Sequence, residues 1–139
     1  MDKENKNKPT PSIDELNDLM TLVVMKSVGK NLKLNYEGFE EFMIDDKPNE
    51  QLGGAHYIFK FPNGYGASVI KHIGSYGFSD DLWEIALIKF PNMTEQMHEP
   101  DGWHLCYIKE LGFDDVIGYL TDEEVCQKLN DIKNYEGGY

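Results

Sequence analysis

Apolar and polar residues alternate most clearly between residues 53 and 90, and this pattern predicts the centre of a β-sheet. Residues 55–61 repeat with a period of two, which is typical of a strand with one buried face. Residues 82–90 are apolar at almost every position, which suits a central strand covered on both sides. Together with residues 66–70 between them, these segments predict three successive strands.

The turn after the first of these strands is predicted from the pair Asn63-Gly64. A two-residue type I′ turn needs a positive φ at both central residues, and Asn and Gly tolerate that conformation best. Such a loop predicts that Phe59 faces Ser68, with the even-numbered residues of the following strand on the same face as the large rings.

Two helices are predicted, one on each side of the sheet segment in sequence. Ser12 and Glu15 have the spacing of a capping box, and an apolar stripe follows over residues 13–28. Thr121 and Glu124 form a second capping box, before a helix that extends to about residue 135. The residues expected to face inward in this last helix are Val125, Leu129 and Ile132.

The other segments have weaker patterns. Residues 32–36 alternate and predict a first short strand, whereas residues 39–50 fit a helical turn and a strand nearly equally well. Residues 103–109 and 115–120 predict two further strands. The fold class is therefore α+β, with a four- to five-stranded, mainly antiparallel sheet packed by an N-terminal and a C-terminal helix. Residues 1–11 are expected to be a flexible leader, and residues 12–139 a single domain.

Charge is the most distinctive bulk property. The 139 residues carry 25 Asp and Glu against 13 basic residues, a net charge of −12, and all 13 basic residues are Lys. Arg is the side chain that binds phosphates and guanine edges in a bidentate manner, so a chain without Arg is poorly suited to reading nucleic acid. The negative charge also repels polyanions and anionic membranes. The expected partner is a protein with a basic surface, although acidity of this kind also serves solubility alone.

Cysteine usage favours a reducing compartment. Cys106 and Cys126 lie far apart, without a CxxC spacing, and the polar start MDKENKNKPTP does not resemble a secretion signal. We therefore expect reduced thiols and a location in the cytosol.

Patterns for metal or nucleophilic chemistry are weak. His104 and Cys106 share one face of a predicted strand, but no HExxH, HxxxH or CxxC spacing accompanies the four histidines. No serine has a GxSxG context, and the glycine-rich runs lack the phosphate-binding spacings. The sequence therefore predicts no enzyme, no cofactor and no metal. A small metal-dependent hydrolase or nuclease using His and Asp remains as the alternative.

Paired aspartates occur three times and are the candidate partner-binding residues. Adjacent residues on a strand point to opposite faces, so such a pair is no catalytic dyad by itself. Carboxylates spread over strands and turns can instead imitate the phosphates of nucleic acid and occupy a basic groove on another protein. The residues in question are Asp45, Asp46, Asp80, Asp81, Asp114 and Asp115.

The central segment resembles small acidic proteins encoded by phages and prophages of low-GC Gram-positive bacteria. The resemblance covers about residues 52–132 and rests on the runs FPNGYGASVIKH, SYG, LWEIALIKF and DVIGYLTDEEV. It includes no known catalytic motif and transfers no functional residue. It implies an inhibitor of host machinery, for instance an anti-CRISPR or other anti-defence protein, that binds a basic or nucleic-acid-binding surface. A self-assembling phage component, forming a homo-oligomer through an apolar sheet face, is a further alternative.

Overall fold

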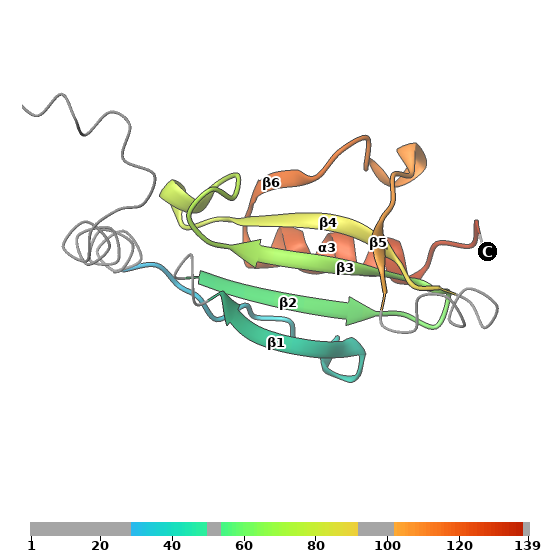
Figure 1. Cartoon of the computed structure of the whole chain (residues 1–139). Coiled ribbons are helices and arrows are strands. Elements are labelled where there is room, and N and C mark those ends of the chain that lie inside the picture. Colours follow the sequence, from blue (N-terminus) through green and yellow to red (C-terminus); the bar gives the residue numbers. More distant parts are fainter. Residues whose placement is uncertain (1–28, 50–53, 92–101, 138–139) are drawn as a thin grey trace, which may run out of the picture.

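The computed structural model describes residues 29–49, 54–91 and 102–137, and Figure 1 shows their arrangement. The predicted leader, residues 1–11, and the predicted helix, residues 13–28, lie outside this part of the chain. The strands are β1 Met43–Asn49, β2 Gly54–Lys60, β3 Tyr65–Lys71, β4 Trp83–Lys89, β5 His104–Leu105 and β6 Ile117–Leu120. Three short 3-10 helices, η2 Glu40–Phe42, η3 Phe78–Asp80 and η4 Lys109–Leu111, and the helix α3 Asp122–Lys133 complete the described elements.

The strands form one antiparallel sheet with the order β1-β2-β3-β4-β5. Strand β6 pairs with the first part of β4, and β5 pairs with its last part, so both lie along the same side of β4. The α+β class and the antiparallel pairing are confirmed. Within the described residues the sheet has six strands when the two-residue β5 is included, against the four to five that were expected.

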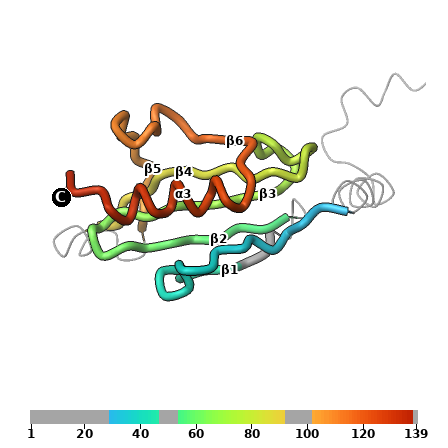
Figure 2. Tube along the Cα trace, turned by 180° about the vertical axis from the view of Figure 1, so that it is seen from behind, coloured from blue at the N-terminus to red at the C-terminus, as the bar shows by residue number. Residues whose placement is uncertain are grey.

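Helix α3 covers one face of the sheet, as the view from behind in Figure 2 shows. Its start was correctly predicted: Thr121 Oγ1 accepts a hydrogen bond from Glu124 N, and Glu124 Oε1 accepts one from Thr121 N. The inward stripe is also confirmed, because Val125, Leu129 and Ile132 are completely buried. They pack in the main core with residues from three strands, among them Tyr57, Phe59, Ala67, Val69, Trp83, Ile85 and Leu87.

The hairpin between β2 and β3 differs from the prediction. Phe61 O accepts from Gly64 N at 3.1 Å, and Phe61 N donates to Tyr65 O at 2.8 Å, so the loop has three residues, not two. Within the loop only Gly64 has a positive φ, of 90°. Pro62 fits the second position of a type I turn, and a glycine in the left-handed region then forms the bulge that completes such a hairpin.

The longer loop shifts the register by one residue. Phe59 faces Ala67 and Ile58 faces Ser68, so the odd-numbered residues of β3 share the helix-covered face with the rings of β2. The predicted pairing of Phe59 with Ser68 was therefore wrong. A slip of one residue moves every side chain of a strand to the opposite face, which explains why one wrong turn type reversed the whole strand.

Four weaker predictions are also refined. Residues 32–36 form no strand, although Leu34 is buried and its N–H donates to the Tyr57 hydroxyl at 3.3 Å. The ambiguous residues 39–50 contain both the helical turn η2 and the strand β1. The strand expected at 103–109 pairs only at His104–Leu105, and the strand expected at 115–120 spans Ile117–Leu120.

Candidate protein-binding surface

The six predicted aspartates do not form one cluster. Asp45 and Asp46 lie in β1, at one edge of the sheet, whereas Asp114 and Asp115 precede β6 on the far side of β4. Strands β2 and β3 lie between β1 and β4. Because neighbouring strands are about 4.8 Å apart, strands β1 and β4 are roughly 14 Å apart. Asp80 ends η3, just before β4 begins. A partner that contacts all three pairs would have to span the width of the sheet.

Four of these aspartates are exposed, and the other two are partly buried. The exposed ones are Asp46, Asp80, Asp114 and Asp115. Asp115 Oδ1 also accepts a hydrogen bond from Val116 N at 2.7 Å. Asp45 is partly buried and acts on the nearby His56 ring, whose pKa is nevertheless lowered because burial outweighs the carboxylate. The exposed members are therefore the ones whose carboxylates are available to a partner.

Asp81 has a structural partner inside the protein. Its Oδ1 accepts from Lys71 Nζ at 2.9 Å and from Asn31 N at 2.7 Å. Burial alone would raise the pKa of the Asp81 carboxyl, but the hydrogen bonds from Lys71 and Asn31 hold it below its ordinary value. Asp81 therefore fixes the segment around Asn31 against the sheet, and any contact it makes with a partner comes in addition to that role.

Lys71 is the centre of this polar cluster and is only 1% exposed. Its ammonium also donates to Asn31 O at 2.7 Å and lies 4.3 Å from the centroid of the Trp83 ring. The Trp83 indole N–H in turn donates to Asp122 Oδ1 at 2.7 Å. A buried ammonium is tolerable only when it is paired and hydrogen-bonded, and here a carboxylate, a carbonyl and an aromatic face fulfil that condition.

A second group of acids comes together where residues 35–40 meet the first turn of α3. Asn35, Glu37, Asp122, Glu123 and Cys126 line a hollow there, which we call the acidic hollow. Asp122 Oδ2 accepts from Asn35 N at 3.1 Å, which ties the two segments together. The carboxylates of Glu37 and Glu123 are exposed. These residues are about 85 positions apart in sequence, and the fold joins them.

The surroundings of the thiol in the acidic hollow disfavour its nucleophilic thiolate form. Burial, together with the negative charges of Asp122 and Glu40, raises the pKa of Cys126. Its Sγ donates to Asn35 O at 3.2 Å. A thiol is reactive as a thiolate, and a raised pKa disfavours that form. The hollow therefore presents carboxylates and a protonated thiol, which suits contact with cationic groups.

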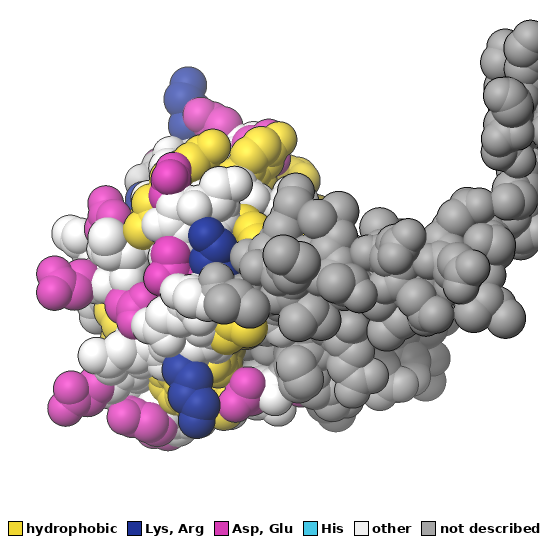
Figure 3. Space-filling view, turned by 90° about the vertical axis from the view of Figure 1, so that its left-hand side faces the viewer, with side chains coloured by type: hydrophobic (Ala, Val, Ile, Leu, Met, Phe, Trp, Pro, Cys, Tyr) yellow, Lys and Arg dark blue, Asp and Glu magenta, His cyan; other side chains and the backbone are white. Residues whose placement is uncertain are grey.

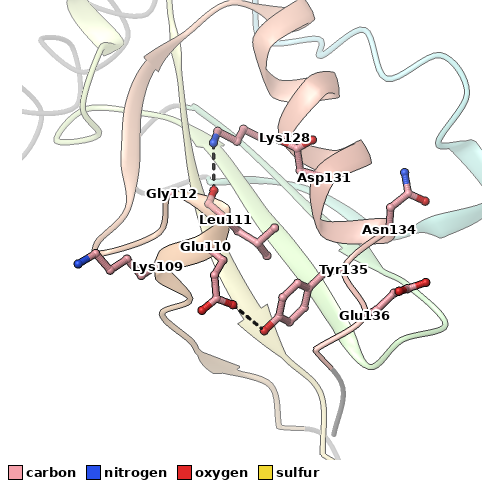
Figure 4. Close-up of a pocket in the computed structure, with 9 residues that line it drawn as sticks. All are labelled: Lys109, Glu110, Leu111, Gly112, Lys128, Asp131, Asn134, Tyr135 and Glu136. Atoms are coloured by element: carbon pink, nitrogen blue, oxygen red, sulfur yellow. Dashed lines mark hydrogen bonds between the residues drawn. The ribbon is translucent and has the colours of Figure 1, made fainter.

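A groove of mixed charge lies at the opposite end of α3 (Figure 4). Lys128 Nζ donates to Leu111 O at 3.1 Å, and Tyr135 Oη donates to Glu110 Oε2 at 3.4 Å, so side chains bridge from the helix end to η4. Lysines and acids alternate around this groove, and it offers no single sign of charge to a ligand.

Acidic side chains are spread over the surface seen in Figure 3, with lysines at few places. Between residues that the structure describes, the ion pair of Lys71 and Asp81 is the only one between Lys and a carboxylate. Most carboxylates of the described residues therefore have no described lysine within ion-pair distance.

The described residues contain no group of three or more His, Cys, Asp or Glu side chains that could hold a metal ion. His104, on β5, is exposed, and Cys106, directly after β5, is partly buried. His98 lies outside the described residues. No helix in the described part of the chain is long and apolar enough to cross a membrane.

The chain matches no protein-family model, no curated protein and no solved structure. The function must therefore be argued from the residues themselves.

The acidic hollow could not be recognised from the sequence, because its residues come from two separate segments. The acids of each segment can be explained without the other segment. Glu37 opens a run of acids, and Glu123 and Asp122 stand in the first turn of a capped helix, where carboxylates favour the helix dipole. A hydrophobic stripe shows which face of a helix is buried, but it does not show which loop lies beside its first turn.

Proposed function

We propose that this protein is a non-enzymatic binding protein that inhibits another protein by occupying a basic, nucleic-acid-binding surface with its own carboxylates. The observation that supports this most is the acidic hollow, where exposed Glu37 and Glu123 stand close together on a chain of net charge −12 without Arg. Such a surface attracts cationic partners at long range and fixes their orientation at short range.

The surroundings of the hollow fix the Asp122 carboxylate and the backbone that carries Glu123. Asp122 is held by Trp83 and Asn35, and the start of α3 is fixed by the reciprocal hydrogen bonds of Thr121 and Glu124. Charges held on a rigid scaffold lose little conformational entropy on binding, so more of their interaction energy contributes to affinity.

The resemblance to phage-encoded proteins supplies the biological setting of the proposal. In a bacterial cytosol, the basic surfaces that matter to a phage include those of nucleic-acid-binding defence proteins, such as CRISPR effectors. A protein that covers such a surface blocks DNA or RNA from reaching it, without any catalytic step.

Capture of a partner from lysate of a low-GC Gram-positive host, at low and at high salt, tests the proposal. We expect one dominant nucleic-acid-binding protein that is lost as salt rises, because screening weakens contacts between exposed charges. Charge reversal by Glu37→Lys with Glu123→Lys should weaken binding of that purified partner and flatten its salt dependence.

Variants with the same change in net charge at other places separate local contact from overall charge. Asp45→Lys with Asp46→Lys, and Asp114→Lys with Asp115→Lys, test the pairs predicted from sequence. Asp131→Lys with Glu136→Lys, exposed at the far end of α3, is the matched control. Equal effects of all four double variants, or no effect of any, would contradict a defined acidic contact surface.

A second candidate function, self-assembly, is favoured by one specific observation. Trp103, Leu105 and Tyr107 are all exposed; Trp103 precedes β5, Leu105 ends it, and Tyr107 follows it. A row of large apolar side chains at the end of a sheet is a common site of association between protein chains. The mass of the protein in solution, measured by light scattering, tests this candidate.

A further inference from the structure

Two exposed tyrosines lie in paired backbone segments at the edge of the molecule near β6. Tyr76, in the loop between β3 and β4, is 59% exposed, and Tyr119, in β6, is 57% exposed. Their backbones are joined, because Tyr119 N donates to Tyr76 O at 3.2 Å. Figures 1 and 2 both show that loop beside β6. Large aromatic side chains are normally placed in a core, so two exposed rings on paired backbone segments call for an explanation.

The backbone at Tyr119 is strained. Trp83 faces Leu120 and Ile85 faces Ile117, so two residues of β6, Gly118 and Tyr119, stand opposite one residue of β4. This is a β-bulge, a feature that bends a strand and redirects a side chain. Tyr119 adopts a φ of 60°, a left-handed conformation that a bulky residue rarely takes and that Gly or Asn would hold at lower cost. The ring at this position is thus kept at an energetic cost.

Close packing holds the two tyrosines in place. A Cβ on Gly118 would overlap the Cβ of Tyr76, and a Cβ on Gly77 would lie 2.8 Å from Tyr119 N. Glu84 Oε1 also accepts a hydrogen bond from Tyr76 N at 2.9 Å. Both segments therefore approach one another as closely as their glycines allow, so the backbones that carry the two rings are packed directly against each other.

We propose that Tyr76 and Tyr119 are the aromatic anchors for arginine side chains of a basic protein partner. This inference rests on the proposed function and names the side chain that the partner contributes. Aromatic faces attract guanidinium groups, and Tyr is enriched among the residues that dominate interface energetics. Exposed Asp80 lies in the same loop as Tyr76, and the carboxylate of partly exposed Glu84 accepts a hydrogen bond from Tyr76 N. Carboxylates therefore accompany the rings. The chain itself has no Arg, so a second copy cannot supply the guanidinium.

Fluorescently labelled nona-arginine and nona-lysine peptides, titrated at low salt and followed by anisotropy, test the proposal. The two peptides carry the same charge, but Arg gains both from bidentate pairing with carboxylates and from stacking on aromatic rings. The contribution of the rings is therefore the part of the Arg preference that is lost when the tyrosines are replaced. We expect the protein to prefer nona-arginine. The double variant Tyr76→Leu with Tyr119→Asn should lose about tenfold in affinity for nona-arginine, and far less for nona-lysine.

Two controls make the outcome decisive. Tyr107→Leu removes a ring of nearly equal exposure, 56%, from the β5 segment and should leave both affinities unchanged. Tyr119→Asn alone should unfold at the same or a higher temperature than the parent protein, because Asn accepts the left-handed backbone, while its preference for nona-arginine falls. A merely structural Tyr119 would give the opposite result, a lower unfolding temperature with the preference intact.

The failures can be told apart. Equal binding of the two peptides, or an Arg preference that survives the double variant, would overturn the aromatic anchors and leave the acidic surface standing. Absence of binding to either peptide would overturn the anchors and the proposed function together.

Discussion

The buried ammonium of Lys71 shows how a single residue can join distant parts of this fold. It sits on the helix-covered face of β3, among apolar core residues, and still reaches a carboxylate on Asp81 and a carbonyl on Asn31. Through these contacts the irregular segment that begins the described chain is attached to the sheet. The segment later contributes Asn35 to the acidic hollow, so Lys71 indirectly supports the candidate binding surface.

Replacement of this lysine is expected to be costly. Lys71→Met keeps the length and apolar volume of the side chain but leaves the Asp81 carboxylate without its cation. We expect the free energy of unfolding to fall by about 2 kcal/mol, less than for a fully buried pair because Asp81 is 37% exposed. Urea denaturation measures the change. Lys33→Met, at an exposed lysine, should stay within about 0.5 kcal/mol of the parent, and equal values for both variants would contradict this role.

Acid titration should reveal the same contact. The folded-state pKa of Asp81 lies below its ordinary value of 3.8, so between the two values the unfolded chain binds more protons. The stabilising contribution is therefore complete above about pH 3.8 and is lost as the pH falls through the folded-state pKa. The stability difference between the parent and Asp81→Asn should shrink below that pH. The exposed neighbour variant Asp80→Asn provides the control, and a difference that persists unchanged at low pH would contradict the assignment.

At the level of elements, the hairpin of β2 and β3 is joined to the end of α3 by one side chain. Asn63 Nδ2 donates to Ile132 O at 2.7 Å and to Tyr135 O at 3.0 Å, while its Oδ1 accepts from Tyr65 N at 3.0 Å. The last carbonyls of a helix have no partner within the helix, so this amide satisfies groups that would otherwise need water. The hairpin turn thus fixes where the helix ends over the sheet.

Asn63→Ala should therefore destabilise two elements at once. The variant loses the hydrogen bonds of this amide, all of them to neutral groups and each worth about 1 kcal/mol or less, so we expect a loss of about 2 kcal/mol in the free energy of unfolding. Asn130→Ala, on the exposed side of α3, is the matched control and should be neutral or slightly stabilising, because Ala has the higher helix propensity. Similar losses in the two variants, measured in urea, would show that Asn63 does not connect the turn to the helix.

Features that depend on neighbouring residues in sequence were predicted well. The alternation around Tyr57 and Phe59, the apolar run around Ile85, and the capping box of Thr121 each involve a few adjacent positions. Asn63-Gly64 also marked the correct turn. The error lay in the loop length, because Pro62 was not read as the second residue of a type I turn, and the register of β3 followed from it.

Features that depend on contact between distant segments could not be predicted. Lys is seldom buried, and nothing near Lys71 in sequence indicates that Asn31 and Asp81 would surround its ammonium. The pairing of β6 with β4 produces the bulge at Tyr119, and the sequence there reads as an ordinary short strand. The paired aspartates were visible in sequence, but only the sheet order separates them into different surfaces.

At the level of the whole molecule, net charge sets how the two candidate interactions respond to salt. With a charge of −12, two copies of the chain repel one another, whereas a basic partner is attracted. Added salt screens both effects, since the screening length falls from about 10 Å at 0.1 M to about 3 Å at 1 M. Binding of a basic partner should weaken as salt rises, and self-association through apolar side chains should strengthen.

The salt dependence of self-association can be measured directly. We expect a monomer at low salt and a measurable share of larger species at roughly 1 M salt, where repulsion is screened. Leu105→Asp places a charge within the exposed row of Trp103, Leu105 and Tyr107 and should abolish the larger species. Ile44→Asp, at a slightly more exposed apolar side chain of β1, should not. Light scattering at both salt concentrations measures the change. A stable oligomer already present at low salt, and lost in Leu105→Asp, would instead favour self-assembly as the function, because association that overcomes the full repulsion of two acidic chains requires an interface evolved for it.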